Sequence, residues 1–404
     1  MKRLVVVGNG MAGFACLQQI LQRPHDFEIT VFGDEPRANY DRNVLASVLA
    51  GLKSPDEIAL NDWNWYQDNG ILTRLGVHVV RLDPARRLVI DEDGGATEYD
   101  RLILAMGARP WLPPIAGLNL DNVYTLRTLD DAGLMLQRLR PGLRTTVIGG
   151  GVQGVETACA LRLQGCEVTL VQLAGRLLEH HLDAAASAYV QHKLEALGVR
   201  VMLGAETQSL SGRGSVETVR LPSGLLIPAE IVVMATGVQP DVELARQAGL
   251  NVRRGVLVND YLETSAPGIF AAGGCTEHRG QTYCWGEAIL EQAGVLAAAI
   301  TGNSGPAFTG AAPVTKLSLA GIDILSAGSV DEIAPGVEIL QYDDPLRGAY
   351  KKLFLKDNRL VGVILAGEVS DEQRYRDWLS GGADLSELHP VLLSPRPLEE
   401  TAAT

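Results

Sequence analysis

The feature that most constrains the fold of this chain is a glycine-rich unit that occurs twice. Each copy has an apolar strand-like run, the pattern G-x-G-x-x-G, and then a run with the apolar spacing of a helix. The copies read LVVVGNGMAGFACLQQIL, from Leu4, and TTVIGGGVQGVETACALRL, from Thr145. Their glycines are Gly8, Gly10 and Gly13 in the first copy and Gly149, Gly151 and Gly154 in the second. Such a pattern predicts a phosphate site at a helix N-terminus, as in dinucleotide-binding folds.

A single G-x-G-x-x-G also fits a strand-to-helix turn that holds no ligand. Two copies in the same strand and helix context favour two dinucleotide sites. Two sites in one chain have a chemical meaning, because one nucleotide can stay bound as a flavin while the other exchanges as a hydride donor. We therefore predict a resident flavin and an exchanging pyridine nucleotide.

Ribose recognition in this fold depends on an acid about 20 residues after the last glycine. In the first unit Glu35 lies 22 residues after Gly13, and Asp34 is an equally good candidate. In the second unit Gln172 takes this place. Gln172 can bind a ribose hydroxyl, but unlike an acid it would not repel a 2′-phosphate. Arg176 nearby could attract a 2′-phosphate. The choice between NADH and NADPH is therefore open.

Charge and apolar patterning exclude two classes of partner. The net charge of −13 and the absence of a Lys/Arg run disfavour nucleic acid. No apolar run reaches the length of about 18 residues that a membrane span needs. The first apolar run, Leu4–Val7, is too short for a signal peptide, so we expect a cytoplasmic protein without membrane contact.

The five cysteines show neither a C-x-x-C pair nor the spacing of metal ligands, so we predict no metal site. Cys16, Cys159 and Cys166 stand among apolar residues in or beside predicted helices, where buried, inert thiols are expected. Cys275 and Cys284 are the only thiols expected near a flavin. Because the segment between Gly33 and Leu60 also lacks cysteine, a disulfide relay is disfavoured and electrons would leave the flavin directly.

Proline-rich exits from the strands at 99–114 and 229–240 suggest where the domains divide. We predict a discontinuous first nucleotide domain at 1–113 and 242–310, with a second nucleotide domain inserted at 114–241. Residues 311–404 would form a small separate domain, in which the turn Lys356–Asn358 joins two strands in a hairpin.

Several motifs in order, GNGMAG, ITVFGDEP, NYDR, LILAMGARPW, GGGVQGVE, ATGVQP and GIFAAGGC, resemble those of two-nucleotide FAD/NAD(P)H oxidoreductases over nearly the whole chain. The nearest likeness is to the flavin-binding N-terminal portion of assimilatory nitrite reductase large subunits. Rubredoxin reductases and oxygenase-type ferredoxin reductases are similar relatives. The resemblance implies an α/β fold of two Rossmann-like domains, an FAD domain with an inserted NAD(P) domain, plus a small α+β C-terminal domain.

The resemblance also implies a set of flavin contacts. They are Gly8, Gly10, Met11, Ala12, Gly13, Asp34, Glu35, Arg42, Ser47, Ala105, Gly107, Arg109, Arg127, Gly273, Gly274, Trp285 and Ala288. Arg109 and Arg127 would fit surface ion pairs equally well, and Trp285 would fit an ordinary half-buried position. Ser47 stands where oxygenase-type reductases have a lysine. Gly274 replaces the carboxylate that grips the flavin's ribityl chain in the family, which puts the FAD affinity in doubt.

For the pyridine nucleotide the implied contacts lie around the second glycine turn. They are Gly149, Gly151, Val152, Gln153, Gly154, Glu156, Gln172, Arg176, Thr236 and Gly237. Glu156 would lie near the nicotinamide; alternatively it is a surface glutamate favoured by the helix dipole. No side chain is expected to act as a catalytic acid, base or nucleophile, because positioning and flavin electronics carry the chemistry.

The resemblance implies an oxidoreductase that passes electrons from NAD(P)H through FAD to a metal centre on a partner protein. Nitrite reductase large subunits continue into iron–sulfur and sirohaem modules that this sequence lacks, so we expect the partner to be the metal-containing subunit of a nitrate- or nitrite-assimilating system. Rubredoxin or ferredoxin is the alternative partner. An NAD(P)H oxidase that uses oxygen, and a non-catalytic redox-sensing flavoprotein, are the alternatives from other classes.

Overall fold

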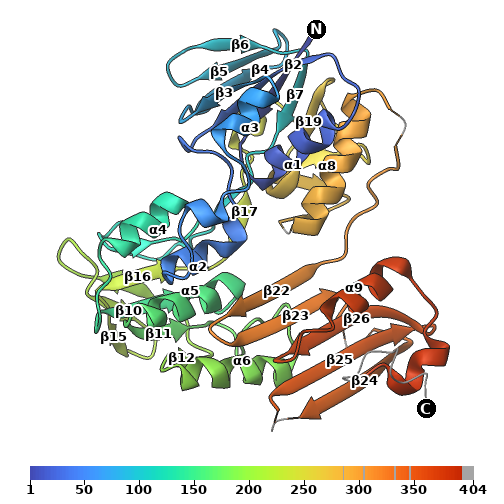
Figure 1. Ribbon diagram of the computed structural model, residues 1–404. Coiled ribbons are helices and arrows are strands. Elements are labelled where there is room, and N and C mark those ends of the chain that lie inside the picture. Colours follow the sequence, from blue (N-terminus) through green and yellow to red (C-terminus); the bar gives the residue numbers. More distant parts are fainter. Residues whose placement is uncertain (285, 304, 332–333, 345–346, 394–404) are drawn as a thin grey trace. The chain divides into compact units, whose positions relative to one another are not determined.

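The structure is a computed structural model that describes residues 1–404 except 285, 304, 332–333, 345–346 and 394–404. The chain forms two compact units (Figure 1). The first comprises Met1–Leu45, Lys53–Trp111 and Val238–Ala311, and the second comprises Ala46–Leu52, Leu112–Gly237 and Ala312–Thr404. The second unit thus contains residues 114–237 of the predicted inserted domain and residues 312–404 of the predicted C-terminal domain. The boundaries of these domains stay a prediction.

A parallel five-stranded sheet with the order β19-β7-β1-β2-β3 forms the centre of the first unit. Its strands are β1 (Lys2–Val7), β2 (Phe27–Gly33), β3 (Ile71–Leu75), β7 (Arg101–Leu104) and β19 (Ile269–Ala271). Both faces are buried, as expected for a parallel sheet. Leu4 and Val6 face a core formed with α1 (Met11–Leu21) and α8 (Gly286–Ile300), which lie side by side in Figure 1.

The opposite face of this sheet carries Val5 and Val7, because side chains alternate along a strand. There they join a core with Val79 and Leu82 of an antiparallel sheet. That sheet consists of β4 (Val79–Asp83), β5 (Leu88–Asp91) and β6 (Ala96–Glu98).

Smaller elements complete the first unit. They are α3 (Trp63–Asp68), α7 (Glu243–Gln247), the pair β8 (Ala108–Pro110) and β17 (Val238–Pro240), and the sheet of β18 (Val256–Val258), β20 (Thr276–His278) and β21 (Gln281–Thr282). The short helix α2 (Leu45–Leu49) belongs to the second unit from Ala46 on. β8 and β17 pair antiparallel at the points where the chain leaves and re-enters this unit.

A second parallel five-stranded sheet, with the order β12-β11-β10-β16-β9, lies in the second unit. It contains β9 (Val123–Tyr124), β10 (Arg144–Ile148), β11 (Glu167–Val171), β12 (Arg200–Met202) and β16 (Ile231–Met234), with the helices α4 (Leu129–Leu136), α5 (Val152–Leu163) and α6 (Ala184–Ala196). The antiparallel strands β13 (Ser209–Ser211), β14 (Thr218–Arg220) and β15 (Leu226–Pro228) share a core with it. Both nucleotide units therefore have the predicted strand–turn–helix start.

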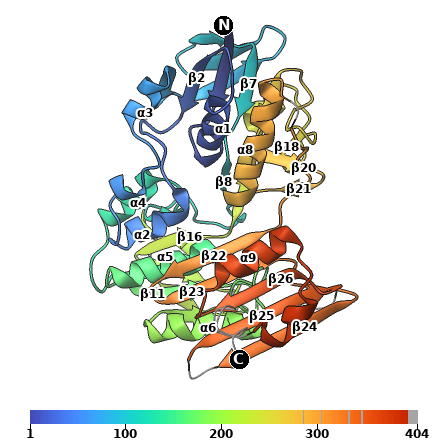
Figure 2. The ribbon, with the colours of Figure 1, turned by 45° about the vertical axis from the view of Figure 1, so that its right-hand side comes forward.

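The C-terminal part of the second unit is an antiparallel sheet with the order β22-β23-β26-β25-β24 (Figure 2). Its elements are β22 (Val314–Leu319), β23 (Ile322–Gly328), β24 (Val337–Asp344), β25 (Ala349–Lys356), β26 (Arg359–Ala366) and α9 (Glu372–Gly381), which packs on β26 and β23. The predicted hairpin is confirmed: Asp357 and Asn358 join β25 to β26 with φ of 50° and 58°, the left-handed values of a tight two-residue turn.

Candidate dinucleotide sites

The first glycine turn has a tightly packed side and an open side. Gly8 has φ of +112°, and a Cβ on it would lie 2.2 Å from the Ala105 carbonyl oxygen. A Cβ on Gly13 would lie 2.0 Å from the Gly8 carbonyl oxygen. At Gly10, by contrast, a Cβ would meet only the Arg42 Nε, at 4.0 Å. The backbone around Gly10 is thus open to a ligand.

The second turn repeats this geometry in the other unit. Gly149 also has φ of +112°, with its Cβ position 2.2 Å from the Ala235 carbonyl oxygen, and the Cβ position of Gly154 lies 1.8 Å from the Gly149 carbonyl oxygen. Nothing lies within 4 Å of the Cβ position of Gly151. Gly10 and Gly151 are the N-cap residues of α1 and α5 and carry no side chain to cap them. The first N–H groups of each helix can therefore bind a pyrophosphate, so both turns fit a dinucleotide.

Three loops meet at the carboxyl ends of β1, β7 and β19 in the first unit, which are neighbours in the sheet. The turn at Gly8 contacts the end of β7 through Ala105, and a Cβ on Gly273 would lie 2.5 Å from the Cβ of Ala12. Gly273 has φ of +78°, and its N–H donates to Gln292 Oε1 at 2.7 Å. This is the edge of a parallel sheet where ligands bind in such folds.

The two acidic candidates of the first unit differ in their surroundings. Glu35 is mostly buried and accepts hydrogen bonds from the Tyr40 hydroxyl, at 2.7 Å, and from Arg42. Asp34 is 73% exposed and contacts His78 Nδ1 at 3.0 Å. Because Arg42 also lies over the turn at Gly10, Glu35 is the better placed candidate for a ribose beside that turn.

Polar residues that the sequence did not single out hold the first turn in place. Asn39 is 2% exposed and donates to the Asn9 carbonyl oxygen, while the Tyr66 hydroxyl donates to Asn9 Oδ1 at 2.8 Å. Gln292, on α8, is fully buried and holds Gly273. Asn9 stands between the first two glycines of the motif, and this position is the sequence signal for the group that it forms with Asn39 and Tyr66. No spacing rule in the sequence identifies Gln292.

The remaining flavin-side candidates are spread over both units. Met11, Ala105, Gly107, Gly274 and Ala288 lie in the first unit, whereas Ser47 and Arg127 belong to the second. Trp285 lies outside the described residues.

Two of these candidates have contacts that bear on their roles. Arg109 donates to Asp241 Oδ1 at 2.9 Å, so the ion pair considered for it is present. A Cβ on Gly274 would meet Cys284 Sγ at 3.3 Å, which leaves a carboxylate there only modest room.

Around the second turn, the strand ends bring several candidates together. Val152 begins α5, Gln153 Nε2 donates to the Leu126 carbonyl oxygen, and Thr236 and Gly237 lie in the loop after β16, one residue past its end. Gly150 N donates to Gln172 Oε1 at 2.7 Å. These groups surround the open backbone at the start of α5.

Glu156 lies one turn into α5, and burial raises the pKa of its carboxyl to about 8. Its protonated form is therefore favoured at neutral pH, because a buried charge without compensation is costly.

The thiols offer no relay. None of the five cysteines forms a disulfide, and only Cys284 is exposed. Burial raises the pKa of Cys16, Cys159 and Cys275 to about 12, so these three are thiols and not thiolates at neutral pH. Cys275, one of the two thiols expected near the flavin, is thus inert.

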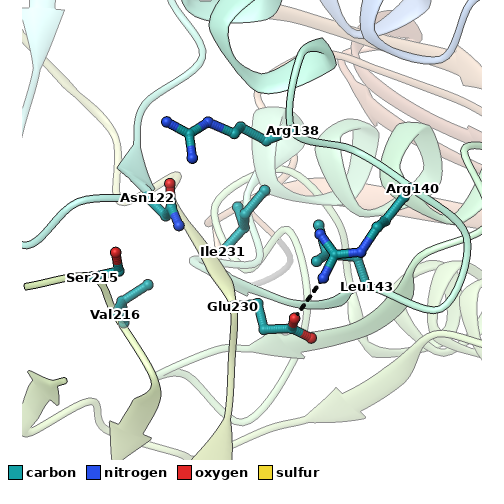
Figure 3. Close-up of a pocket in the computed structure, with 8 residues that line it drawn as sticks. All are labelled: Asn122, Arg138, Arg140, Leu143, Ser215, Val216, Glu230 and Ile231. Atoms are coloured by element: carbon teal, nitrogen blue, oxygen red, sulfur yellow. Dashed lines mark hydrogen bonds and ion pairs between the residues drawn. The ribbon is translucent and has the colours of Figure 1, made fainter. Parts of the chain in front are cut away.

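A separate cavity of about 240 Å³ lies in the second unit (Figure 3). Its lining residues are Asn122, Arg138, Arg140, Leu143, Ser215, Val216, Glu230 and Ile231. Arg140 donates to Glu230 at 2.9 Å, so part of its charge is balanced internally. The lining includes none of the candidate dinucleotide-site residues.

Two further features of the described residues bear on other functions. Within the part of the chain that the structure describes, no group of His, Cys, Asp or Glu side chains is arranged to hold a metal ion. None of the described helices has the length and apolar character needed to span a bilayer.

Comparison with known proteins agrees with the presence of dinucleotide sites. Residues 2–293 match the family described as pyridine nucleotide-disulphide oxidoreductase, and residues 313–382 match the C-terminal domain of rubredoxin NAD+ reductase. The assimilatory nitrate reductase electron transfer subunit of Bacillus subtilis (strain 168) is 38% identical over 98% of this chain and 51% of its own length. Nitrite reductase [NAD(P)H] of the same organism is 37% identical over 100% of this chain and 50% of its own length.

The chain thus spans about half the length of these curated relatives. Among solved structures, the covalent putidaredoxin reductase–putidaredoxin complex is similar, with a TM-score of 0.87 and 28% identity over 100% of this chain and 98% of that one. With two matching glycine turns and a family match over most of its length, the chain belongs to the pyridine nucleotide-disulphide oxidoreductases, FAD-containing enzymes that use NADH or NADPH, although none of its own cysteines forms a disulfide.

Proposed function

We propose that this chain passes electrons from NADH or NADPH, through FAD, to a metal centre on a partner protein of nitrate or nitrite assimilation. The observation that carries the proposal is the pair of open glycine turns at Gly10 and Gly151 in a chain whose cysteines form no disulfide. Two relatives whose names give nitrate or nitrite reductase functions support the choice of partner.

The residues of the first unit would hold FAD, which accepts two electrons from the pyridine nucleotide and can release them singly. The N–H groups at the start of α1 would bind its pyrophosphate, with Arg42 above the turn adding positive charge. Glu35 would accept a hydrogen bond from a ribose hydroxyl. Ala12, Gly273 and the buried Gln292 would fix the backbone that lies beside the cofactor.

In the second unit the start of α5 would bind the pyridine nucleotide in the same way. Gly151 leaves its backbone open, while Gly149 and Gly154 allow strand and helix to approach closely. Glu156, uncharged at neutral pH, would present a carboxylic acid to the nicotinamide without placing a buried negative charge near it.

The thiol chemistry argues for an external acceptor. A dithiol relay needs two accessible sulfurs, of which at least one forms a thiolate. Four of the five cysteines are buried, so the exposed Cys284 cannot form such a pair without local opening. Electrons would therefore leave the flavin for a group outside this chain.

Rubredoxin or a ferredoxin is the second candidate for the acceptor. The match of residues 313–382 to a rubredoxin reductase domain favours it. The net charge of −13 opposes it, since these carriers are commonly acidic and would need a local positive patch. We also propose the domain boundaries given above and a cytoplasmic location, where both nucleotides are available.

The proposal is tested by offering the purified flavoprotein different acceptors. NADH oxidation is followed with oxygen alone, with rubredoxin, with a [2Fe–2S] ferredoxin, and with a sirohaem-containing nitrite reductase fragment. We expect slow turnover with oxygen and fast turnover with the sirohaem protein. Fast turnover with oxygen alone would instead identify an oxidase. Flavin that NADH and NADPH do not reduce would identify a non-catalytic flavoprotein.

A further inference from the structure

The loop that follows β11 is packed directly on the second glycine turn. Gln172, just past the end of β11, is 5% exposed and accepts the Gly150 N–H at 2.7 Å. Leu178 N donates back to the Gly150 carbonyl oxygen at 2.9 Å. A Cβ on Gly150 would lie 2.6 Å from Leu177 Cδ2. The segment 173–183 is therefore held where the adenosine ribose of a nucleotide would lie beside this turn.

This loop brings a carboxylate to the strand end, where the sequence shows only glutamine. Glu179 Oε2 accepts a hydrogen bond from Gln172 Nε2 at 2.7 Å. Its other oxygen, Oε1, lies 3.7 Å from His180 Nε2, and the side chain is 28% exposed. Glu179 is thus oriented by Gln172 and keeps one oxygen directed away from that hydrogen bond, available to accept another.

The loop is also held from the C-terminal sheet of the same unit. His181 Nδ1 lies 3.0 Å from Thr315 Oγ1, and Ser326 donates to the His181 carbonyl oxygen. Lys352 Nζ lies 2.9 Å from Asp183 Oδ2 in a pair with both side chains at most 10% exposed. Together with the hydrogen bond of Leu178 to Gly150, just before Glu179, these contacts after it reduce the freedom of the loop, so the carboxylate is preorganised.

We propose that Glu179 is the residue that selects NADH over NADPH, which rests on the proposed function. Its carboxylate would accept a hydrogen bond from the 2′-hydroxyl of the adenosine ribose. A 2′-phosphate at this place would meet a like charge in a partly buried setting, where screening is weak. The ligand class is therefore a pyridine dinucleotide with a free ribose 2′-hydroxyl.

Arg176 is the residue that would oppose this selection. Its guanidinium donates to the main-chain oxygen of Glu179 at 3.1 Å, so it is engaged with the loop backbone. The guanidinium of Arg176, which could bind a 2′-phosphate, thus points toward the loop backbone. The carboxylate of Glu179, by contrast, is oriented by its hydrogen bond from Gln172.

The test measures binding of ADP-ribose and 2′-phospho-ADP-ribose to the oxidised holoprotein by calorimetry. Both probes lack nicotinamide, so the readout does not depend on electron transfer. For the unaltered protein we expect ADP-ribose to bind at least about tenfold more tightly. Glu179→Gln should reduce this ratio mainly by strengthening 2′-phospho-ADP-ribose binding, and Glu179→Lys should invert the preference.

Glu195→Gln is the matched control, because Glu195 also accepts from a glutamine Nε2, that of Gln191 at 2.8 Å, but lies on α6. It should leave the ratio unchanged. Equal affinity of the unaltered protein for the two probes, or an unchanged ratio in Glu179→Gln, would overturn the inference. If neither probe bound to the unaltered protein, the nucleotide site would be absent and both proposals would be rejected. Selective binding without flavin reduction would leave the inference standing and reject the proposed function.

Discussion

Gly154 approaches Gly149 so closely that a Cβ on Gly154 would lie 1.8 Å from the Gly149 carbonyl oxygen. The same relationship holds between Gly13 and Gly8 in the other unit, at 2.0 Å. In both places a backbone oxygen occupies the space that any side chain would need. The third glycine of each motif is therefore required for helix–strand packing, before any ligand is considered.

Gly154→Ala should therefore destabilise the second unit by ~3 kcal/mol or more, because neither backbone can move without disturbing α5 and β10. The matched change Gly133→Ala, in α4, places its Cβ where nothing lies within 4 Å. It should shift the free energy of unfolding by at most ~1 kcal/mol, in the stabilising direction. Urea unfolding of both variants measures this; equal stabilities would contradict the packing argument.

The second glycine of each motif should behave differently, because its Cβ position is open. Asp is a better N-cap than Gly, so Gly151→Asp and Gly10→Asp should fold. Each adds a carboxylate where a pyrophosphate would bind. Gly151→Asp should keep the flavin colour and lose ADP-ribose binding at least about tenfold, whereas Gly10→Asp should lose flavin and keep ADP-ribose. Absorbance measures the bound flavin, and calorimetry measures the binding of ADP-ribose. Loss of flavin in Gly151→Asp, or loss of ADP-ribose binding in Gly10→Asp, would refute the assignment of the two turns.

Glu156 gives a pH dependence of stability with a defined sign. Its pKa is raised from 4.5 to about 8 by burial, so the folded protein holds a proton that the unfolded chain has released. The free energy of unfolding therefore falls as the pH rises from 4.5 to about 8. Glu156→Gln should remove this fall and be more stable than the unaltered protein by ~1 kcal/mol or more at alkaline pH.

The unaltered protein and Glu156→Gln should differ little in their free energy of unfolding at a pH below 4.5, where Glu156 is protonated in both the folded and the unfolded state. Thermal unfolding across this range, with exposed Glu167→Gln as the control, measures the difference. A stability gain that is the same at all pH values would point to packing and not to the carboxyl.

Thiol labelling tests the absence of a sulfur relay. In the native protein a bulky thiol reagent should modify Cys284 rapidly and the four buried cysteines only after denaturation. Cys284→Ser should abolish the fast phase while NADH still reduces the flavin and the acceptor. If this variant lost electron transfer but kept flavin reduction, Cys284 would lie on the electron path.

Much of the fold could be predicted because its determinants are local. Gly8 and Gly149 share a φ of +112° that only glycine adopts readily, and Asp357 and Asn358 favour a left-handed turn. These requirements can be recognised within a few neighbouring residues.

The acid beside Gln172 could not be predicted, because Glu179 reaches the strand end only when its loop folds back on Gly150. Gln292 was missed for the same reason: it holds a backbone group 19 residues away, from a helix whose sequence otherwise predicts only apolar packing. Contacts between distant segments depend on the tertiary fold, and a single sequence carries no spacing rule for them.

An anaerobic titration with NADH, followed by the visible flavin band, tests the central claim most directly. An electron-transfer flavoprotein without a redox disulfide should be bleached fully by one equivalent of NADH per flavin, and the sirohaem partner should restore the colour. Two equivalents would indicate that a disulfide also takes up electrons. No bleaching with NADH or NADPH would contradict the hydride step itself, and with it the proposed electron path.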